Sequence, residues 1–138
     1  MIDRDAIIAE AQSWLGTPYR HAHNIKGVGI DCAMLLVECY RAPRGTVPVD
    51  FDPRPYPQFW YLHRDEERYL ANMLPFAERT TDPRPADVAL YRFGRSASHG
   101  AIIVNEDLMI HAFAPLGRVA IMERRALDFR LDSYWTVK

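Results

Sequence analysis

The chain has little cysteine, little net charge and no long apolar run, and each shortage excludes a class of protein. Only 2 of its 138 residues are cysteines, which is too few for a disulfide framework. Its 17 basic and 18 acidic side chains give a formal charge of −1, without the positive field that is typical of nucleic-acid binders. No apolar run has the length needed to span a bilayer. We therefore expect neither a nucleic-acid partner nor a membrane span.

The rest of the composition is that of one globular domain. Hydrophobic residues make up 49% of the sequence and charged residues 25%, which excludes whole-chain disorder. A chain of 138 residues favours one domain over two, so we assign residues 1–138 to a single domain. The amino terminus lacks a basic leader followed by an apolar stretch. We therefore expect synthesis in the cytoplasm without a signal peptide.

Helical patterns occupy the first half of the chain, and short strands occupy the second. Apolar residues at helical spacing predict the helices, with Asp3 and Asp31 as caps of the first two. After Pro85 the pattern changes to short runs separated by turn residues, which predicts an antiparallel sheet of about five strands. This is the α+β arrangement. The predicted helices cover residues 3–15, 32–41 and 58–74, and the predicted strands cover 88–93, 100–104, 108–113, 119–123 and 134–137.

Cys32 stands at the first turn of the second predicted helix, directly after a loop. A thiol there faces unpaired backbone N–H groups and the positive end of the helix dipole, and both favour the reactive thiolate. Cys39 follows in the same helix, about 10 Å further along the axis, which is too far for a disulfide between the two. We interpret Cys39 as packing. Cys32 considered alone also fits packing, so its interpretation depends on other residues.

Two histidines, His99 and His111, belong to a predicted hairpin. If residues 105–107 form its loop, Ile102 opposes Ile110, and the two histidines share one face as diagonal neighbours roughly 7 Å apart. A two-residue turn would place them on opposite faces. One thiol at a helix start and two histidines on one face supply a nucleophile, a base and an orienting group. The pattern therefore favours a cysteine hydrolase.

Four blocks of sequence surround these side chains. They are Trp14-Leu15-Gly16-Thr17-Pro18-Tyr19-Arg20, Gly29-Ile30-Asp31-Cys32-Ala33, Ser98-His99-Gly100 and Met109-Ile110-His111-Ala112. Together and in this order they resemble the NlpC-type papain-like cysteine peptidases, and the match covers nearly the whole chain. Residues 62–70 and 87–94 resemble the branch of that family that is encoded beside phage-tail and gene-transfer-agent genes.

The resemblance implies a papain-like fold and a role for each matched residue. Cys32 would be the nucleophile, His99 the general base, and His111 the third polar residue that holds the His99 ring. Tyr19 and Asp31 would belong to the oxyanion and substrate-binding set. No cofactor or metal is implied. The implied activity is hydrolysis of peptidoglycan stem peptides, most characteristically between D-glutamate and a diamino acid. The resemblance also implies that a phage-tail-like particle carries the enzyme to the cell wall, with tail proteins as possible partners.

Several alternatives stay open. Met34 stands where family members commonly have glycine, which leaves the substrate pocket beside the nucleophile undetermined. His21 and His23 with Cys32 could form a metal site, although zinc sites usually have a fourth protein ligand or an open catalytic position. A non-catalytic or weakly catalytic tail-assembly module would have the same fold. The same triad could also act on other acyl groups, such as amides or lipid esters.

Overall fold

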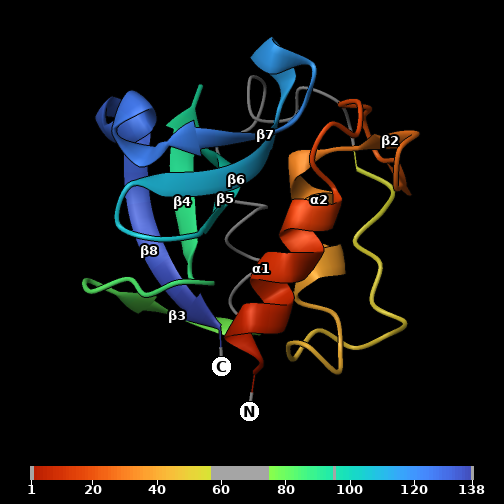
Figure 1. The fold of residues 1–138 in the computed structure, drawn as a ribbon, viewed down its shortest axis with the longest axis horizontal. Helices are drawn as coiled ribbons and strands as arrows, with labels where there is room; N and C mark the ends of the chain where they lie inside the picture. Colours follow the sequence, from red (N-terminus) through yellow and green to blue (C-terminus); the bar gives the residue numbers. More distant parts are fainter. Residues whose placement is uncertain (1, 57–74, 95, 138) are drawn as a thin grey trace.

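A helical layer packs on one antiparallel sheet in the computed structural model, which describes residues 2–56, 75–94 and 96–137 (Figure 1). The predicted helix at 58–74 lies outside the described residues. The helices are α1 (Arg4–Ser13) and α2 (Cys32–Cys39), and the 3-10 helices are η1 (Ala114–Leu116) and η2 (Arg124–Arg130). The strands are β1 (Asn24–Ile25), β2 (Gly29–Ile30), β3 (Ala77–Thr80), β4 (Val88–Phe93), β5 (Ser96–Ile103), β6 (Leu108–Phe113), β7 (Arg118–Glu123) and β8 (Leu131–Val137).

Both α-helices begin where the sequence predicts, because an aspartate caps each of them. The Asp3 carboxylate accepts a hydrogen bond from the Ala6 backbone N–H, and Asp31 accepts one from the Met34 N–H. Each helix ends two residues earlier than predicted. Beyond α1 the chain turns through Gly16, whose φ of +85° lies in the left-handed region that favours glycine.

Within the described residues the sheet has six strands, in the order β3-β8-β4-β5-β6-β7, rather than the predicted five. The additional strand is β3, which pairs with β8 at one edge of the sheet. Its sequence, Ala-Glu-Arg-Thr, is short and polar, and its partner lies more than 50 residues further along the chain, so no local pattern indicates it. β5 and β8 also begin earlier than predicted, because both pair with β4 along its length. A two-stranded hairpin, β1–β2, stands where the sequence predicts only a loop.

The predicted β5–β6 register is confirmed. Ile102 pairs with Ile110, and Ile103 pairs with Met109. The loop between the strands closes on Asn105, whose side-chain oxygen accepts hydrogen bonds from the backbone N–H groups two and three residues on, at 2.8 Å each. Alternate residues of the two strands therefore face opposite sides of the sheet.

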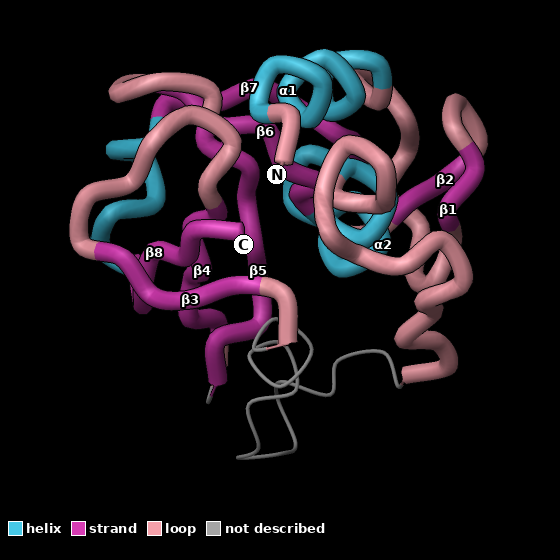
Figure 2. The backbone as a smooth tube through the Cα atoms, turned by 90° about the horizontal axis from the view of Figure 1, so that it is seen from below, coloured by secondary structure: helices cyan, strands magenta, loops and turns pink. Residues whose placement is uncertain are grey.

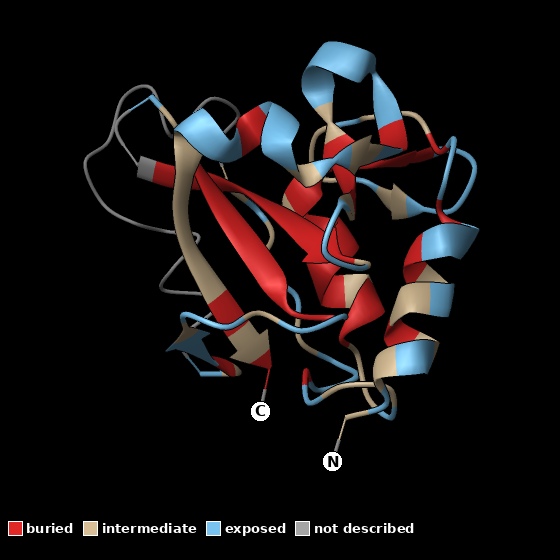
Figure 3. Cartoon of the chain, turned by 60° about the vertical axis from the view of Figure 1, so that its left-hand side comes forward, coloured by how far each residue is buried: buried red, intermediate tan, exposed pale blue. Residues whose placement is uncertain are grey.

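The two faces of the sheet are covered differently. Helices α1 and α2 pack against one face, where Ile102 and Ile110 join the larger core cluster (Figure 1, Figure 2). On the other face, Leu127 of η2 covers a smaller cluster that includes Tyr91 and Met109. Figure 3 shows the inner strands buried between these layers. Among the described residues, no helix is both long and apolar enough to cross a membrane.

Candidate active site

The first turn of α2 places Cys32 against strand β5. The Cys32 Sγ lies 3.8 Å from the carbonyl oxygen of Ser98, the residue before His99. At this point the β4–β5 ladder shifts register between Tyr91 and Arg92, which leaves Ser98 as the extra residue on β5. The side chain of Cys32 is largely buried. The structure thus brings the predicted nucleophile beside the strand segment that carries the predicted base.

His99 on β5 and His111 on β6 form a directly bonded pair. The Nε2 atom of His99 lies 2.7 Å from Nδ1 of His111, and the ring centroids are 5.0 Å apart. Both side chains are buried. The predicted shared face of the two histidines is therefore confirmed. The contact uses Nε2 of His99, so the Nδ1 atom of that ring does not take part in this hydrogen bond.

Aromatic rings bury this pair, and burial lowers the pKa of both imidazoles. The centroids of Tyr91, Phe93 and Phe113 lie 6.1, 5.7 and 5.5 Å from that of His99. Phe113 also stacks on His111, with centroids 4.7 Å apart. Burial, with a smaller contribution from His111, holds the pKa of His99 well below its usual range. Burial likewise lowers the pKa of His111 to about 4. Both imidazoles are therefore neutral near pH 7 and able to accept a proton.

The carboxylate of Asp31 organises the loops around the start of α2. One oxygen caps the helix at the Met34 N–H, and the other accepts hydrogen bonds from the Ala22 N–H at 2.7 Å and the Tyr56 hydroxyl at 2.5 Å. Burial and then the Asp31 charge raise the pKa of the Tyr56 phenol, which stays protonated as a donor. Sequence reasoning missed Tyr56, because it stands in a proline-rich stretch 25 residues from Asp31 with no pattern to link them.

Tyr19 lies in the same region as these groups. Its backbone N–H donates to the Gly117 carbonyl at 2.8 Å, and its side chain packs on the larger core cluster. The charges of Cys32 and Tyr19 make smaller contributions to the raised pKa of the Tyr56 phenol. The oxyanion role of Tyr19 and the substrate-binding role of Asp31 stay predictions.

The remaining candidate residues serve other purposes. His21 Nε2 lies 3.0 Å from the Tyr56 carbonyl oxygen, and His23 Nδ1 lies 2.9 Å from the His21 carbonyl oxygen. Within the described part of the chain, no three His, Cys, Asp or Glu side chains group as metal ligands. Cys39 is fully buried in the larger core cluster, and burial raises the pKa of its thiol. It is a packing residue, as the sequence predicts.

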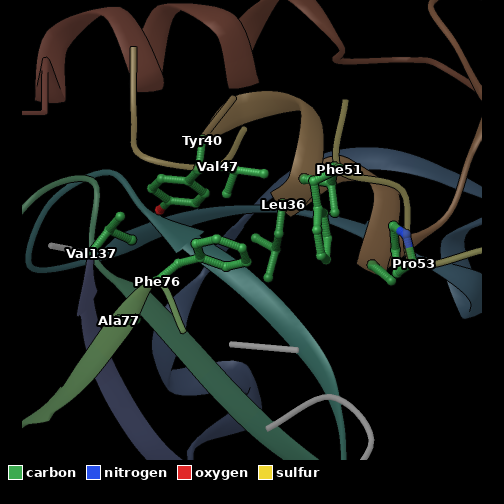
Figure 4. Close-up of a pocket in the computed structure, with 10 residues that line it drawn as sticks. Leu36, Tyr40, Val47, Phe51, Pro53, Phe76, Ala77 and Val137 are labelled. Carbon is green, nitrogen blue, oxygen red and sulfur yellow. The ribbon is translucent and has the colours of Figure 1, made fainter. Parts of the chain in front are cut away.

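An apolar pocket lies apart from the histidine pair. It opens beside α2 and the first residues of β3, with Leu36, Phe51, Pro53 and Phe76 among its lining (Figure 4). Its volume of about 60 Å³ is far smaller than the several hundred Å³ of a typical ligand site. Neither Cys32 nor either histidine of the pair contributes to it. The pocket is not the candidate active site.

Comparison with known proteins gives a fold but no close relative. No family model matches the chain, and no curated protein matches it. Among solved structures, the NlpC/p60 domain of the peptidoglycan hydrolase SagA superposes with a TM-score of 0.66 at 18% identity, over 98% of this chain and 99% of that one. The peptidoglycan hydrolase RipB from Mycobacterium tuberculosis matches with a TM-score of 0.60 at 18% identity, over 96% of this chain and 63% of that one. The P60 domain of an antigen from M. avium paratuberculosis gives a TM-score of 0.58 at 16% identity, over 96% and 90%. The chain therefore has the α+β NlpC/p60 fold, with Cys32 at a helix start and a six-stranded antiparallel sheet.

Proposed function

We propose that this protein is a cysteine peptidase that hydrolyses peptide bonds in peptidoglycan. The observation that carries the proposal is the bonded His99–His111 pair beside the strand segment that contacts the Cys32 thiol. The likeness in fold to structures described as peptidoglycan hydrolases supports the choice of substrate.

The proposed reaction begins when His99 takes the proton of the Cys32 thiol and Sγ attacks the carbonyl carbon of the scissile bond. The backbone N–H of Cys32, at the first turn of α2, and the Tyr19 phenol are the proposed donors to the oxyanion. His99 then passes its proton to the leaving amine, which leaves a thioester on Cys32. Water attacks the thioester carbonyl and gives one proton to His99. The C–S bond then breaks, the acid product leaves, and His99 returns the proton to the Cys32 sulfur.

The neutral state of the histidine pair suits this sequence of steps. Because the pKa of His99 lies well below its usual range, the ring is unprotonated at neutral pH and has a lone pair to take the thiol proton, although the same shift makes it a weaker base than an exposed histidine. His111 contacts Nε2 of His99, the ring nitrogen that does not take the thiol proton, and so fixes the orientation of the ring. Asp31 keeps its proposed place in the substrate-binding set, although three donors already occupy its carboxylate.

The sequence resemblance supports a narrower proposal about substrate and setting. The four matched blocks support cleavage between D-glutamate and the diamino acid of the stem peptide. The resemblance of residues 62–70 and 87–94 to the phage-tail branch supports a protein that is made in the cytoplasm and carried to the cell wall in a tail-like particle. Tail proteins are the proposed partners in that particle.

Digestion of purified cell-wall sacculi tests the proposed activity. We expect the wild-type protein to release new amino groups, and Cys32→Ala to release none, because the nucleophile is gone. Cys39→Ala is the matched control, since this second cysteine is a buried packing residue and its loss leaves the reacting atoms in place. Mass spectrometry of the released muropeptides identifies the bond. Equal release by the wild type and Cys32→Ala would exclude Cys32 as the nucleophile.

A further inference from the structure

The side chain of Met122 contacts the His111 ring at Nε2, the nitrogen that does not contact His99. Met122 lies on β7, two residues beyond Ala120, the β7 partner of His111, so it is a diagonal neighbour on the same face. Its Sδ atom lies 2.9 Å from Nε2 of His111. The chain of contacts therefore runs from Met122 through His111 to His99.

The chemistry of the thioether fixes the direction of every hydrogen bond in that chain. A methionine sulfur can only accept, so Nε2 of His111 carries the proton. Nδ1 of neutral His111 is then an acceptor, and the proton between the rings belongs to Nε2 of His99. Neutral His99 keeps its lone pair on Nδ1. The reverse arrangement would direct a lone pair of His111 at the lone pairs of the sulfur.

We propose that Met122 is a positioning residue that fixes the tautomers of His111 and His99, so that Nδ1 of His99 is the basic nitrogen. This inference rests on the proposed function, in which His99 accepts the proton of Cys32. Because both rings are neutral near pH 7, the tautomer rather than the charge decides which nitrogen can act as the base. A tautomer with the proton on Nδ1 of His99 could not take the thiol proton there.

The neighbouring methionine gives a matched comparison. Met109 on β6 is the cross-strand partner of Met122 and lies in the same apolar cluster. Its sulfur accepts a hydrogen bond from the Tyr91 hydroxyl at 3.1 Å, and among the described residues the ring nitrogens of His99 and His111 bond to each other and to Met122 rather than to Met109. Replacing either methionine by leucine keeps a similar volume, so only the loss of Met122 removes an acceptor from an imidazole.

Long-range ¹H–¹⁵N correlation spectra of the folded protein report the tautomers directly. In the wild type we expect the ring proton of both His111 and His99 on Nε2. In Met122→Leu we expect His111 to show a mixture of tautomers, whereas Met109→Leu keeps the wild-type pattern. Met122→Gln offers a side-chain oxygen as an acceptor, so we expect it to restore the pattern. A wild-type His111 with its proton on Nδ1 would overturn the proposal without any variant.

Alkylation of Cys32 by iodoacetamide at pH 7 links the tautomer to reactivity. If the two tautomers of Met122→Leu become equally populated, the rate constant falls about twofold, because only half of the molecules hold the competent base. Met109→Leu should react as the wild type does. An unchanged tautomer and an unchanged rate in Met122→Leu would show that Met122 only packs. Neither measurement uses a cell-wall substrate, so a failed sacculus digestion with these results intact would reject the proposed substrate and not the role of Met122.

Discussion

Burial changes the titration of the His111 imidazole, and this makes the stability of the fold depend on pH. The folded protein holds the pKa of His111 at about 4, against about 6.5 for an exposed histidine. Between these values the unfolded chain binds more protons than the folded one, so the free energy of unfolding falls as the pH falls. His99, whose pKa is also lowered, changes stability in the same direction. The acid-sensitive interval lies below pH 6.5.

We expect His111 alone to account for a loss of about 2 kcal/mol in the free energy of unfolding between pH 7 and pH 5. Urea unfolding of the wild type and of His111→Asn at both values measures this loss. The variant has no imidazole at this position, so its stability should depend less on pH, with the remainder due to His99 and the carboxylates. The same pH dependence in both proteins would contradict a lowered pKa at His111.

The residues of the candidate site divide into those that a local pattern indicates and those that only the fold reveals. Cys32, His99 and His111 follow from a helix start and a hairpin register, because both are local features of the chain. Tyr56 and Met122 do not. The relevance of Tyr56 depends on a loop that returns to Asp31, and that of Met122 depends on the pairing of β6 with β7. Such contacts carry no short-range signal.

At the scale of elements, α1 and α2 are both capped by an aspartate, but the two aspartates differ in the number of hydrogen bonds that they accept. Asp3 caps α1 at the surface and accepts one hydrogen bond there, from the Ala6 N–H. Asp31 caps α2 inside the protein and also binds the Ala22 N–H and the Tyr56 hydroxyl. Caps predict where the helices begin. Their ends and the polar strand β3 depend on contacts from distant parts of the chain.

We expect Asp31→Ala to lower the free energy of unfolding by about 3 kcal/mol, because it removes the cap and leaves two further donors without their acceptor. Asp3→Ala, the matched change at the other helix, should cost about 1 kcal/mol. Urea unfolding of the two variants and the wild type at pH 7 compares them. Equal losses would mean that the contacts of Asp31 outside the helix contribute nothing to stability.

At the scale of the molecule, the proposed site is divided between two layers. Cys32 belongs to the helical layer, and the histidine pair belongs to the sheet. The α+β arrangement follows from the sequence, because the helical and strand patterns are separate along the chain. The contacts that join the layers cannot be predicted from the sequence, since they link residues from opposite ends of the chain. The geometry of the site therefore depends on interactions between the layers.

One such interaction is the ion pair of Arg4 on α1 with Asp87, just before β4. The Arg4 guanidinium lies 2.9 Å from the fully buried Asp87 carboxylate, and it also donates to the Pro85 carbonyl and the Thr136 hydroxyl. One side chain thus joins α1 to the two strands β4 and β8. Removing Arg4 would leave a buried carboxylate without its cation, which costs more than the pair itself contributes.

We therefore expect Arg4→Met, which keeps the aliphatic stem, to lower the free energy of unfolding by about 2 to 3 kcal/mol. Arg125→Met is the matched control. Its ion pair with Glu123 joins side chains that are 82% and 58% exposed, so its loss should cost less than about 1 kcal/mol. Urea unfolding at pH 7 measures both. If the two variants lose the same free energy, Arg4 is an ordinary surface charge. A larger loss in Arg4→Met, accompanied by slower alkylation of Cys32, would mean that the ion pair aligns the layer carrying the thiol with the layer carrying its base.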